Sequence, residues 1–199
     1  MIRIGLTGGI ASGKSAAAKI LHECGAEVFD ADRIVADLYV PGGEGAKAVE
    51  RLFGREMLDA GGAVSKAKLG KLAFEDPEAR RRLEAAIHPL VIAEIRRRFG
   101  DAERSGAAIA VAEASQILDG GYGREFDRVV LLVAPRSARL ARAEARGISR
   151  GETERRIAAQ IPEEDARRKA DDVIENTGTV EELRKKVEAL YREWVRTGG

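Results

Sequence analysis

The residues with the clearest chemical meaning form a glycine-rich run near the N-terminus. Residues 8–15 read GGIASGKS, the complete G-x-x-x-x-G-K-[ST] spacing of a phosphate-binding loop. Gly8 and Gly13 give such a turn the freedom to point backbone N–H groups at a phosphate, beside the positive end of a helix. Lys14 would reach the β- and γ-phosphates, and the Ser15 hydroxyl would complete the shell of a Mg²⁺ ion. The run therefore predicts binding of a nucleoside triphosphate.

The elements that must position this loop are visible on either side of it and further along the chain. A strand-like run precedes the loop and helix-forming residues, 16–21, follow it, so a turn that binds nothing is the weaker interpretation. The strand-like runs are Ile2–Thr7, Glu27–Phe29, Ala107–Ala112, Arg128–Ala134 and Val173–Ile174. Their alternation with helical patterns predicts a parallel sheet covered by helices, with nucleotide at the carboxyl ends of the strands.

Between the second and third runs lies a long stretch, about 33–105, with helical patterns and almost no strand signal. Its clearest part is Pro77–Phe99, an amphipathic and arginine-rich pattern in which Pro89 is expected to interrupt the helix. A helical insertion of this kind could shape a second binding site, or it could only enlarge the fold. The periodicity does not choose between these two interpretations.

Arginines are concentrated in Pro135–Lys169. Arg139, Arg142 and Arg146 are spaced three and four residues apart, so they are expected on one helix face, where they could gather around a polyphosphate. Phosphoryl transfer needs charge neutralisation and exclusion of water, which a closing arginine-rich lid supplies. The alternative is an ordinary solvated helix face.

Two carboxylates follow the second strand-like run, at Asp30 and Asp32. If both lie in a strand they point to opposite faces, so one would face the ligand and the other would cap the next helix. A carboxylate beside the γ-phosphate can take the proton of an attacking hydroxyl. Glu113, at the end of another strand-like run, is either a carboxylate that orients the water shell of Mg²⁺ or one that faces solvent.

Composition limits the classes of function. The 34 basic and 33 acidic residues give a formal charge of +1, which gives no electrostatic case for a nucleic-acid partner. Cys24 is the single cysteine and cannot form an internal disulfide, and no apolar run is long enough to span a membrane. A strand pattern at the N-terminus, in place of a signal peptide, favours a cytoplasmic protein. No obligatory protein partner is inferred.

Several motifs in this order and spacing resemble the dephospho-coenzyme A kinase family over nearly the whole chain, from Ile4 to about Gly178. They are residues 5–15, GLTGGIASGKS; Asp30-Ala31-Asp32; Ile87-His88-Pro89; Ala158-Ala159-Gln160; and residues 170–178, ADDVIENTG. The resemblance implies ATP- and Mg²⁺-dependent phosphorylation of the ribose 3′-hydroxyl of dephospho-coenzyme A, the last step of coenzyme A synthesis. It also implies an α/β, three-layer P-loop nucleoside triphosphate hydrolase fold. We expect one P-loop kinase domain over 1–199, with a parallel five-stranded sheet, an acceptor-binding helical insertion (about 33–105) and a lid (about 136–168).

The family's site residues carry over onto matching positions of this chain. The catalytic residues implied are Asp32 as base, Lys14 and Arg142. The ATP-binding residues implied are Gly9, Ile10, Ala11, Ser12, Gly13, Lys14, Ser15, Ala16, Arg142, Arg146, Asn176 and Gly178. The acceptor-binding residues implied are Thr7, Asp32, His88, Pro89 and Asp119, and Ser15 is the metal ligand.

Some positions depart from the family's pattern. Ala11 replaces a usual glycine, and Ala16 stands where serine or threonine is common. Residues 113–119, EASQILD, occupy the place of a Pro-Leu-Leu segment that ends in glutamate, so Asp119 stands in for that glutamate. Ser65-Lys66 replaces a common Asp-Arg pair. A kinase with another small acceptor and a P-loop switch that transfers to no acceptor remain the alternatives.

Overall fold

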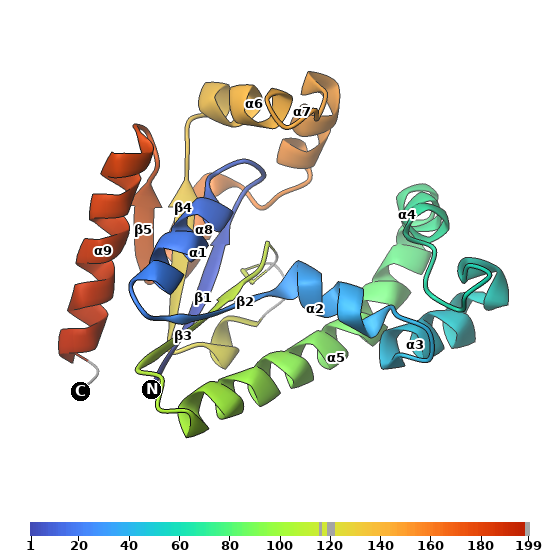
Figure 1. Ribbon diagram of the computed structural model, residues 1–199. Helices are drawn as coiled ribbons and strands as arrows, with labels where there is room; N and C mark the ends of the chain where they lie inside the picture. The colour runs from blue at the N-terminus through green and yellow to red at the C-terminus, as the bar shows by residue number, and fades with distance from the viewer. Residues whose placement is uncertain (116, 119–121, 198–199) are drawn as a thin grey trace. The chain divides into compact units, whose positions relative to one another are not determined.

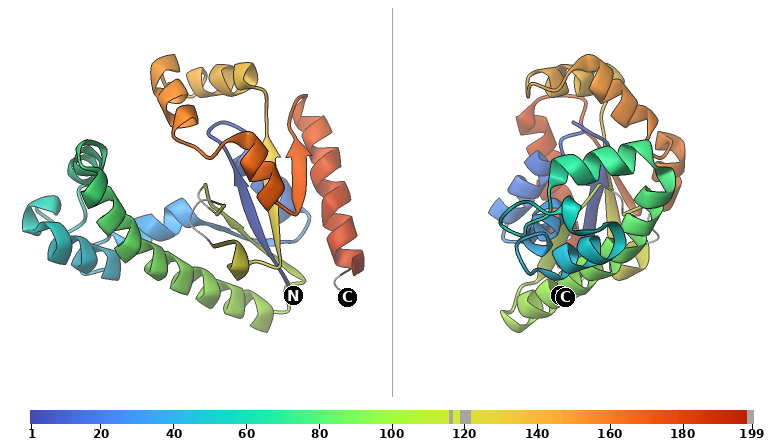
Figure 2. Two further views of the ribbon diagram at one scale, coloured as in Figure 1. Left: turned by 180° about the vertical axis from the view of Figure 1, so that it is seen from behind. Right: turned by 90° about the vertical axis from the view of Figure 1, so that its right-hand side faces the viewer.

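The computed structural model describes residues 1–115, 117–118 and 122–197. The chain divides into two compact units (Figures 1 and 2). The first, called the nucleotide unit below, consists of Met1–Phe29 and Phe99–Gly199. The second, called the helical unit, consists of Asp30–Arg98. Each unit is described on its own.

A five-stranded sheet forms the centre of the nucleotide unit, in the order β2-β3-β1-β4-β5. The strands are β1 (Ile2–Gly8), β2 (Glu27–Asp30), β3 (Ile109–Glu113), β4 (Arg128–Val133) and β5 (Asp172–Glu175). The central strand β1 pairs in parallel with β3 and β4, and β4 pairs in parallel with β5. The α/β fold and the strands expected from the sequence are confirmed.

Alternating side chains on the strands build two separate cores. The face formed by Ile4, Leu6, Val130 and Leu132 packs against α1 (Lys14–Glu23) and α9 (Val180–Thr197). On the other face, Leu131 and Val133 of β4 pack against Ala166 of α8 (Glu163–Lys169). Because both faces are covered, the strands are apolar throughout, as is typical of buried parallel sheets.

Two further helices of the nucleotide unit lie beyond the carboxyl ends of the strands (Figure 1). They are α6 (Arg136–Glu144) and α7 (Arg150–Ala158), which follow β4 directly and precede α8. A short 3-10 helix, η2 (Tyr122–Glu125), lies between β3 and β4. The chain order thus brings α6 and α7 to the sheet edge where the phosphate loop is expected.

The helical unit contains α2 (Ala31–Leu38), α3 (Glu44–Phe53), the 3-10 helix η1 (Arg55–Met57), α4 (Lys66–Glu75) and most of α5 (Pro77–Arg104). An isolated antiparallel bridge joins Leu58 to Val64. The helical character predicted for this stretch is therefore present. Its role as an acceptor-binding insertion stays a prediction.

The expected interruption at Pro89 is wrong, because α5 runs without a break from Pro77 to Arg104. Proline removes one backbone donor and crowds the preceding turn, which disfavours a continuous helix. Packing opposes that effect here, since Ile87, Val91 and Ile95 on either side of Pro89 are all buried. The apolar face keeps the helix intact.

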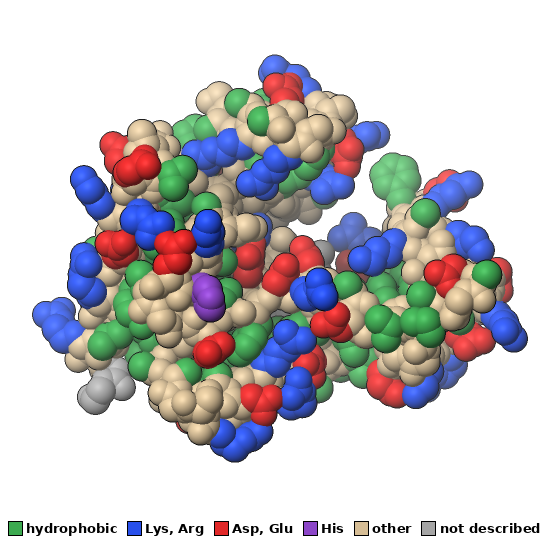
Figure 3. All heavy atoms as spheres, viewed as in Figure 1, with side chains coloured by type: hydrophobic (Ala, Val, Ile, Leu, Met, Phe, Trp, Pro, Cys, Tyr) green, Lys and Arg blue, Asp and Glu red, His purple; other side chains and the backbone are tan. Residues whose placement is uncertain are grey.

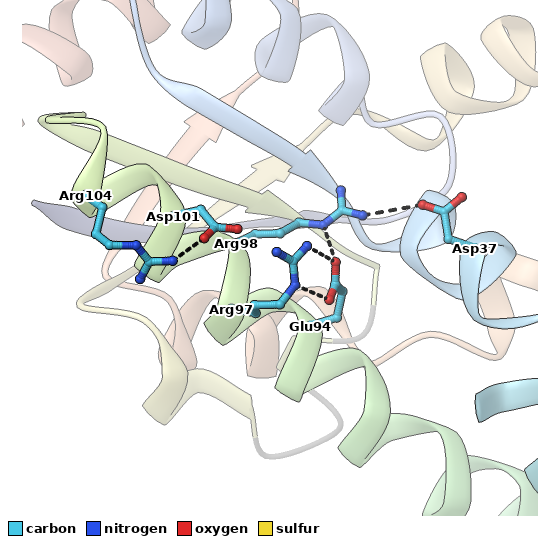
Figure 4. A network of polar contacts seen from close by, with 6 residues as sticks. All are labelled: Asp37, Glu94, Arg97, Arg98, Asp101 and Arg104. Atoms are coloured by element: carbon cyan, nitrogen blue, oxygen red, sulfur yellow. Dashed lines mark hydrogen bonds and ion pairs between the residues drawn. The ribbon is translucent and has the colours of Figure 1, made fainter. Parts of the chain in front are cut away.

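A charged network ties α5 to α2 within the helical unit (Figure 4). Arg97 and Arg98 both donate to the Glu94 carboxylate, with Nε to oxygen distances of 2.8 and 2.9 Å. Arg98 also reaches Asp37 on α2, at 3.4 Å. The hydrogen bond from Arg97, with that from Arg98, lowers the pKa of Glu94 to about 2. Glu94 is therefore charged across the physiological range.

Charges of both signs are mixed over the visible face of the chain (Figure 3). This mixing agrees with the formal charge of +1. None of the helices in the described part of the chain is both long enough and apolar enough to cross a bilayer.

Candidate active site

The turn between β1 and α1 has the backbone conformation that the glycine-rich run predicts. Gly8 and Gly13 have φ angles of 152° and 109°, and Gly13 is the N-cap of α1. A Cβ atom on Gly13 would lie 2.2 Å from Nδ2 of Asn176, and one on Gly8 would lie 2.5 Å from the carbonyl oxygen of Leu132. Conformation and close approach therefore both require glycine at these two positions.

Ala11 takes up a left-handed conformation in the same turn, with φ of 56°. An alanine pays about 1 kcal/mol for this region, whereas glycine enters it freely. This cost is the physical reason to expect glycine at this position, and the turn nevertheless forms with alanine there.

The two polar side chains that follow Gly13 are held at the start of α1. Nζ of Lys14 donates to the carbonyl oxygen of Gly8 at 2.8 Å, so the ammonium group lies at the first residue of the glycine-rich turn. The Ser15 hydroxyl donates to Oε1 of Glu113 at 3.0 Å. This contact brings the Glu113 carboxylate to the hydroxyl expected to bind the metal, and the choice between the two interpretations of Glu113 stays a prediction.

Other segments hold the carbonyl groups of the loop. Asn176, which is 5% exposed, donates from Nδ2 to the carbonyl oxygen of Ser12 at 2.7 Å. Arg142 on α6 donates to the same oxygen at 3.4 Å and to the carbonyl of Asn176 at 3.3 Å. Arg139 donates from Nε to the carbonyl oxygen of Ile10 at 2.9 Å. The segment after β5 and the helix after β4 thus both contact the loop.

The expectation that three arginines share one helix face is wrong for Arg146. Helix α6 ends at Glu144, and Gly147 follows with a left-handed φ of 79°. Arg146 therefore lies in the turn after the helix, where it is exposed. Arg139 and Arg142 remain on α6 and both face the loop.

The two aspartates do not share a strand, but the expectation that one of them caps the next helix is confirmed. Strand β2 ends at Asp30, whose carboxylate caps α2 by accepting from the backbone N–H of Asp32 at 2.8 Å. Asp32 lies in the first turn of α2 and is exposed. A short polar residue is favoured at this cap, so the carboxylate left for chemistry is that of Asp32.

The remaining acceptor residues expected from the sequence fall in different places. Thr7, at the end of β1, is 1% exposed, and its hydroxyl donates to the carbonyl of Ser115 at 3.4 Å. His88 is half-buried and Pro89 exposed, both on α5 of the helical unit. Gly178 precedes α9 and is exposed. Asp119 lies outside the described residues.

A cavity of about 310 Å³ opens beside the loop, within the nucleotide unit. Its lining combines polar residues of the loop and of the α6–α8 segment with apolar residues of β4, α7 and α8. Ser12 is 2% exposed, and in the described part of the chain its hydroxyl has no hydrogen-bond partner. The cavity therefore offers apolar surface together with polar groups able to bind a ligand.

Sequence comparison decides the family. The sequence profile of dephospho-CoA kinase matches residues 2–182. The chain belongs to the dephospho-CoA kinase family. It is 40% identical over 194 residues to a dephospho-CoA kinase of Geobacter metallireducens, covering 97% of this chain and 96% of that protein. A dephospho-CoA kinase of Frankia casuarinae is 39% identical over 193 residues, which cover 97% of this chain and 83% of that protein. The family resemblance drawn from the motifs is confirmed.

Solved structures agree with this placement. A Thermus thermophilus protein superimposes with a TM-score of 0.81 and 35% identity, covering 96% of this chain and 97% of that chain. A shikimate kinase from Acinetobacter baumannii superimposes with a TM-score of 0.56 and 19% identity, covering 97% of this chain and 94% of that chain. At this level of identity the similarity shows the fold alone. The P-loop kinase fold expected from the sequence is thereby confirmed.

Proposed function

We propose that this chain transfers the γ-phosphoryl group of ATP to the ribose 3′-hydroxyl of dephospho-coenzyme A, giving coenzyme A and ADP. The observation that carries this proposal is the phosphate loop in a member of the dephospho-CoA kinase family. In this loop Lys14 contacts the carbonyl of Gly8, and the Ser15 hydroxyl donates to Glu113. These are the parts that phosphoryl transfer needs for positioning and charge neutralisation.

The ATP site is proposed to use the backbone of residues 9–16. Lys14 would exchange its contact with Gly8 for phosphate oxygens, and Arg142 would add a second positive charge from α6. Asn176 and Gly178 would lie by the adenine, with Asn176 also holding Ser12 in place. Arg146 is exposed, and in this proposal it moves onto the phosphates when the segment 136–168 closes as a lid.

The site fits a Mg²⁺ ion, since Ser15 and Glu113 place a hydroxyl and a carboxylate oxygen 3.0 Å apart beside the loop. Hard oxygen ligands of this kind suit magnesium together with phosphate oxygens. Ser15 would hold the ion directly and Glu113 through its water shell. When bound, the ion would neutralise charge on the β- and γ-phosphates.

For the acceptor, the proposed base is Asp32. Its carboxylate is exposed at the start of α2, and Asp30 supplies the cap in its place. It is therefore available to take the proton of the attacking hydroxyl. Thr7, His88, Pro89 and Asp119 are proposed to contact the acceptor.

The test is ATP consumption with and without dephospho-coenzyme A, with mass spectrometry of the product. We expect coenzyme A to form only when the acceptor is present. Asp32→Asn should lower kcat by about 10²- to 10⁴-fold and leave binding of an ATP analogue unchanged. Asp37→Asn, which removes the other carboxylate of α2, is the matched control and should keep most of the activity.

Three results would contradict the proposal. Transfer to another alcohol but not to dephospho-coenzyme A would indicate a kinase with a different acceptor. Slow ATP hydrolysis without any transfer would indicate a nucleotide switch. Full activity of Asp32→Asn would exclude Asp32 as the base.

A further inference from the structure

The side chain of Gln160 lies on the phosphate loop. It follows the C-cap of α7, Ala159. Its carbonyl oxygen Oε1 accepts from Nη2 of Arg139 at 2.6 Å and from the backbone N–H of Ile10 at 3.4 Å. Arg139 in turn donates from Nε to the carbonyl of Ile10 at 2.9 Å. Gln160 and Arg139 together thus occupy both backbone polar groups of one loop residue.

The approach of these two side chains to the loop is close. A Cβ atom on Gly9 would lie 2.3 Å from Nη2 of Arg139 and 2.7 Å from Oε1 of Gln160. Glycine at this position therefore makes room for the pair. Both side chains also line the cavity beside the loop, so the pair lies where a ligand would enter.

Among the described residues, Arg139 donates no hydrogen bond to a carboxylate, although Glu163 lines the same cavity and its charge acts on Arg139 without direct contact. Burial lowers the pKa of its guanidinium group, and the acceptors that the described residues give it, the Ile10 carbonyl and the Gln160 carboxamide, are both neutral. A half-buried cation with only neutral acceptors is less well stabilised than one paired with an anion. The site is electrostatically suited to a negative ligand.

The two donors that meet Gln160 are of the kinds that bind a phosphate. A loop N–H and an arginine fork are the usual donors to phosphate oxygens. The carboxamide oxygen of Gln160 accepts a hydrogen bond from each of these donors but carries no negative charge. A phosphate oxygen would accept the same two hydrogen bonds: the one from the Ile10 N–H would become charge-assisted and about twice as strong, and the one from Arg139 would become an ion pair.

We propose that Gln160 is an internal substitute for a nucleotide phosphate. Its oxygen accepts from the N–H of Ile10 and from the guanidinium of Arg139, the donors that a phosphate would use. Phosphate binding displaces the carboxamide, and Arg139 then pairs with the phosphate. Gln160 is therefore a positioning residue that competes with the nucleotide, so its removal strengthens nucleotide binding. This inference needs the phosphate loop but does not depend on which acceptor the enzyme uses.

The experiment measures binding of the non-hydrolysable ATP analogue AMPPNP and of inorganic tripolyphosphate by calorimetry, without acceptor. Gln160→Ala should bind both about three- to tenfold more tightly, because one competing hydrogen-bond acceptor is lost. Gln160→Asn, whose oxygen is withdrawn by one methylene, should change affinity in the same direction. Gln160→Glu should bind both at least about tenfold more weakly, because its carboxylate pairs with Arg139 and repels phosphate.

Controls separate this role from a structural one. Arg155→Ala removes an exposed side chain of the same helix α7 and should leave both affinities unchanged. Melting temperatures without ligand show whether each variant is folded. A structural role for Gln160 would weaken binding in every variant, so opposite effects of alanine and glutamate support the proposal. Equal or weaker binding by both Gln160→Ala and Gln160→Asn would overturn it, whatever the acceptor assay shows.

Discussion

The two units of this chain hold their functional groups in different ways. In the nucleotide unit, the groups around the phosphate loop are fixed mainly through backbone atoms, such as the carbonyl of Ser12 that Asn176 and Arg142 share. In the helical unit, many of the polar contacts are instead pairs between side chains on helix surfaces, as between Arg80 and Glu84. The first arrangement fixes positions closely, whereas the second lets side chains adjust.

This difference follows from what each unit is proposed to bind. Triphosphate recognition uses backbone N–H groups whose positions must not vary, so the loop is held by buried contacts. Exposed ion pairs are worth little individually and leave the surface free to change. A helical surface can therefore accommodate an acceptor without constraining the donor site.

Replacing Lys14 with alanine gives the largest expected effect and tests the nucleotide unit directly. We expect a loss of about 10²- to 10³-fold in kcat/KM, because one preorganised cation is removed from the transferring phosphate, together with weaker AMPPNP binding. Steady-state kinetics and calorimetry measure the two effects. Lys19→Ala, an exposed lysine of the same helix, should be near wild type. Unchanged AMPPNP affinity in Lys14→Ala would contradict the loop assignment.

Glu94→Gln tests the ion-pair network of the helical unit and should have a smaller effect. The folded-state pKa of Glu94 is lowered from 4.5 to about 2 by its hydrogen bonds from Arg97 and Arg98. Its stabilisation is therefore complete above the unfolded pKa and is lost as pH falls toward about 2. Urea unfolding should show the wild type about 1 kcal/mol more stable than the variant at pH 7.

That difference should shrink as pH falls from 4.5 to about 2. Glu84→Gln, which removes the carboxylate that pairs with Arg80 on α5, is the control and should cost a few tenths of a kcal/mol. A difference between wild type and Glu94→Gln that stays constant down to pH 2 would show that the charged network does not stabilise this unit.

Ala11→Gly should have the smallest effect. Glycine removes the cost of a left-handed alanine, about 1 kcal/mol, but loses about as much through the greater freedom of the unfolded chain. We expect stability within about 0.5 kcal/mol of the wild type and unchanged AMPPNP affinity. Ala18→Gly, inside α1, should instead lose about 1 kcal/mol. Equal losses in the two variants would show that the strain at Ala11 has no energetic consequence.

The parts of the molecule that could be predicted from the sequence are those encoded locally. The phosphate loop depends on spacing within eight residues, and the strands depend on short apolar runs. The family's motif residues Lys14 and Ser15 are at the start of α1, as expected. The family resemblance implies Asp32 as the base, and the cap made by Asp30 leaves the Asp32 carboxylate for that role.

The contacts that sequence reasoning missed join residues far apart in the chain. Asn176 meets Ser12 across 164 positions, and Arg139 meets Ile10 across 129, so spacing contains no signal for them. Gln160 belongs to a motif of the family, but its contact with the loop depends on the path of α6 and α7. The local effect of proline predicts an interruption at Pro89, whereas the packing of α5, which involves residues distant in sequence, keeps the helix continuous.

Trp194 gives the molecule a built-in optical probe. It is the chain's single tryptophan and is 2% exposed in the core that α9 shares with α1 and the sheet. Its fluorescence therefore reports on the nucleotide unit alone, while circular dichroism records the helices of both units. Overlaying the two denaturation curves would reveal, without any label, whether the units unfold together or in sequence.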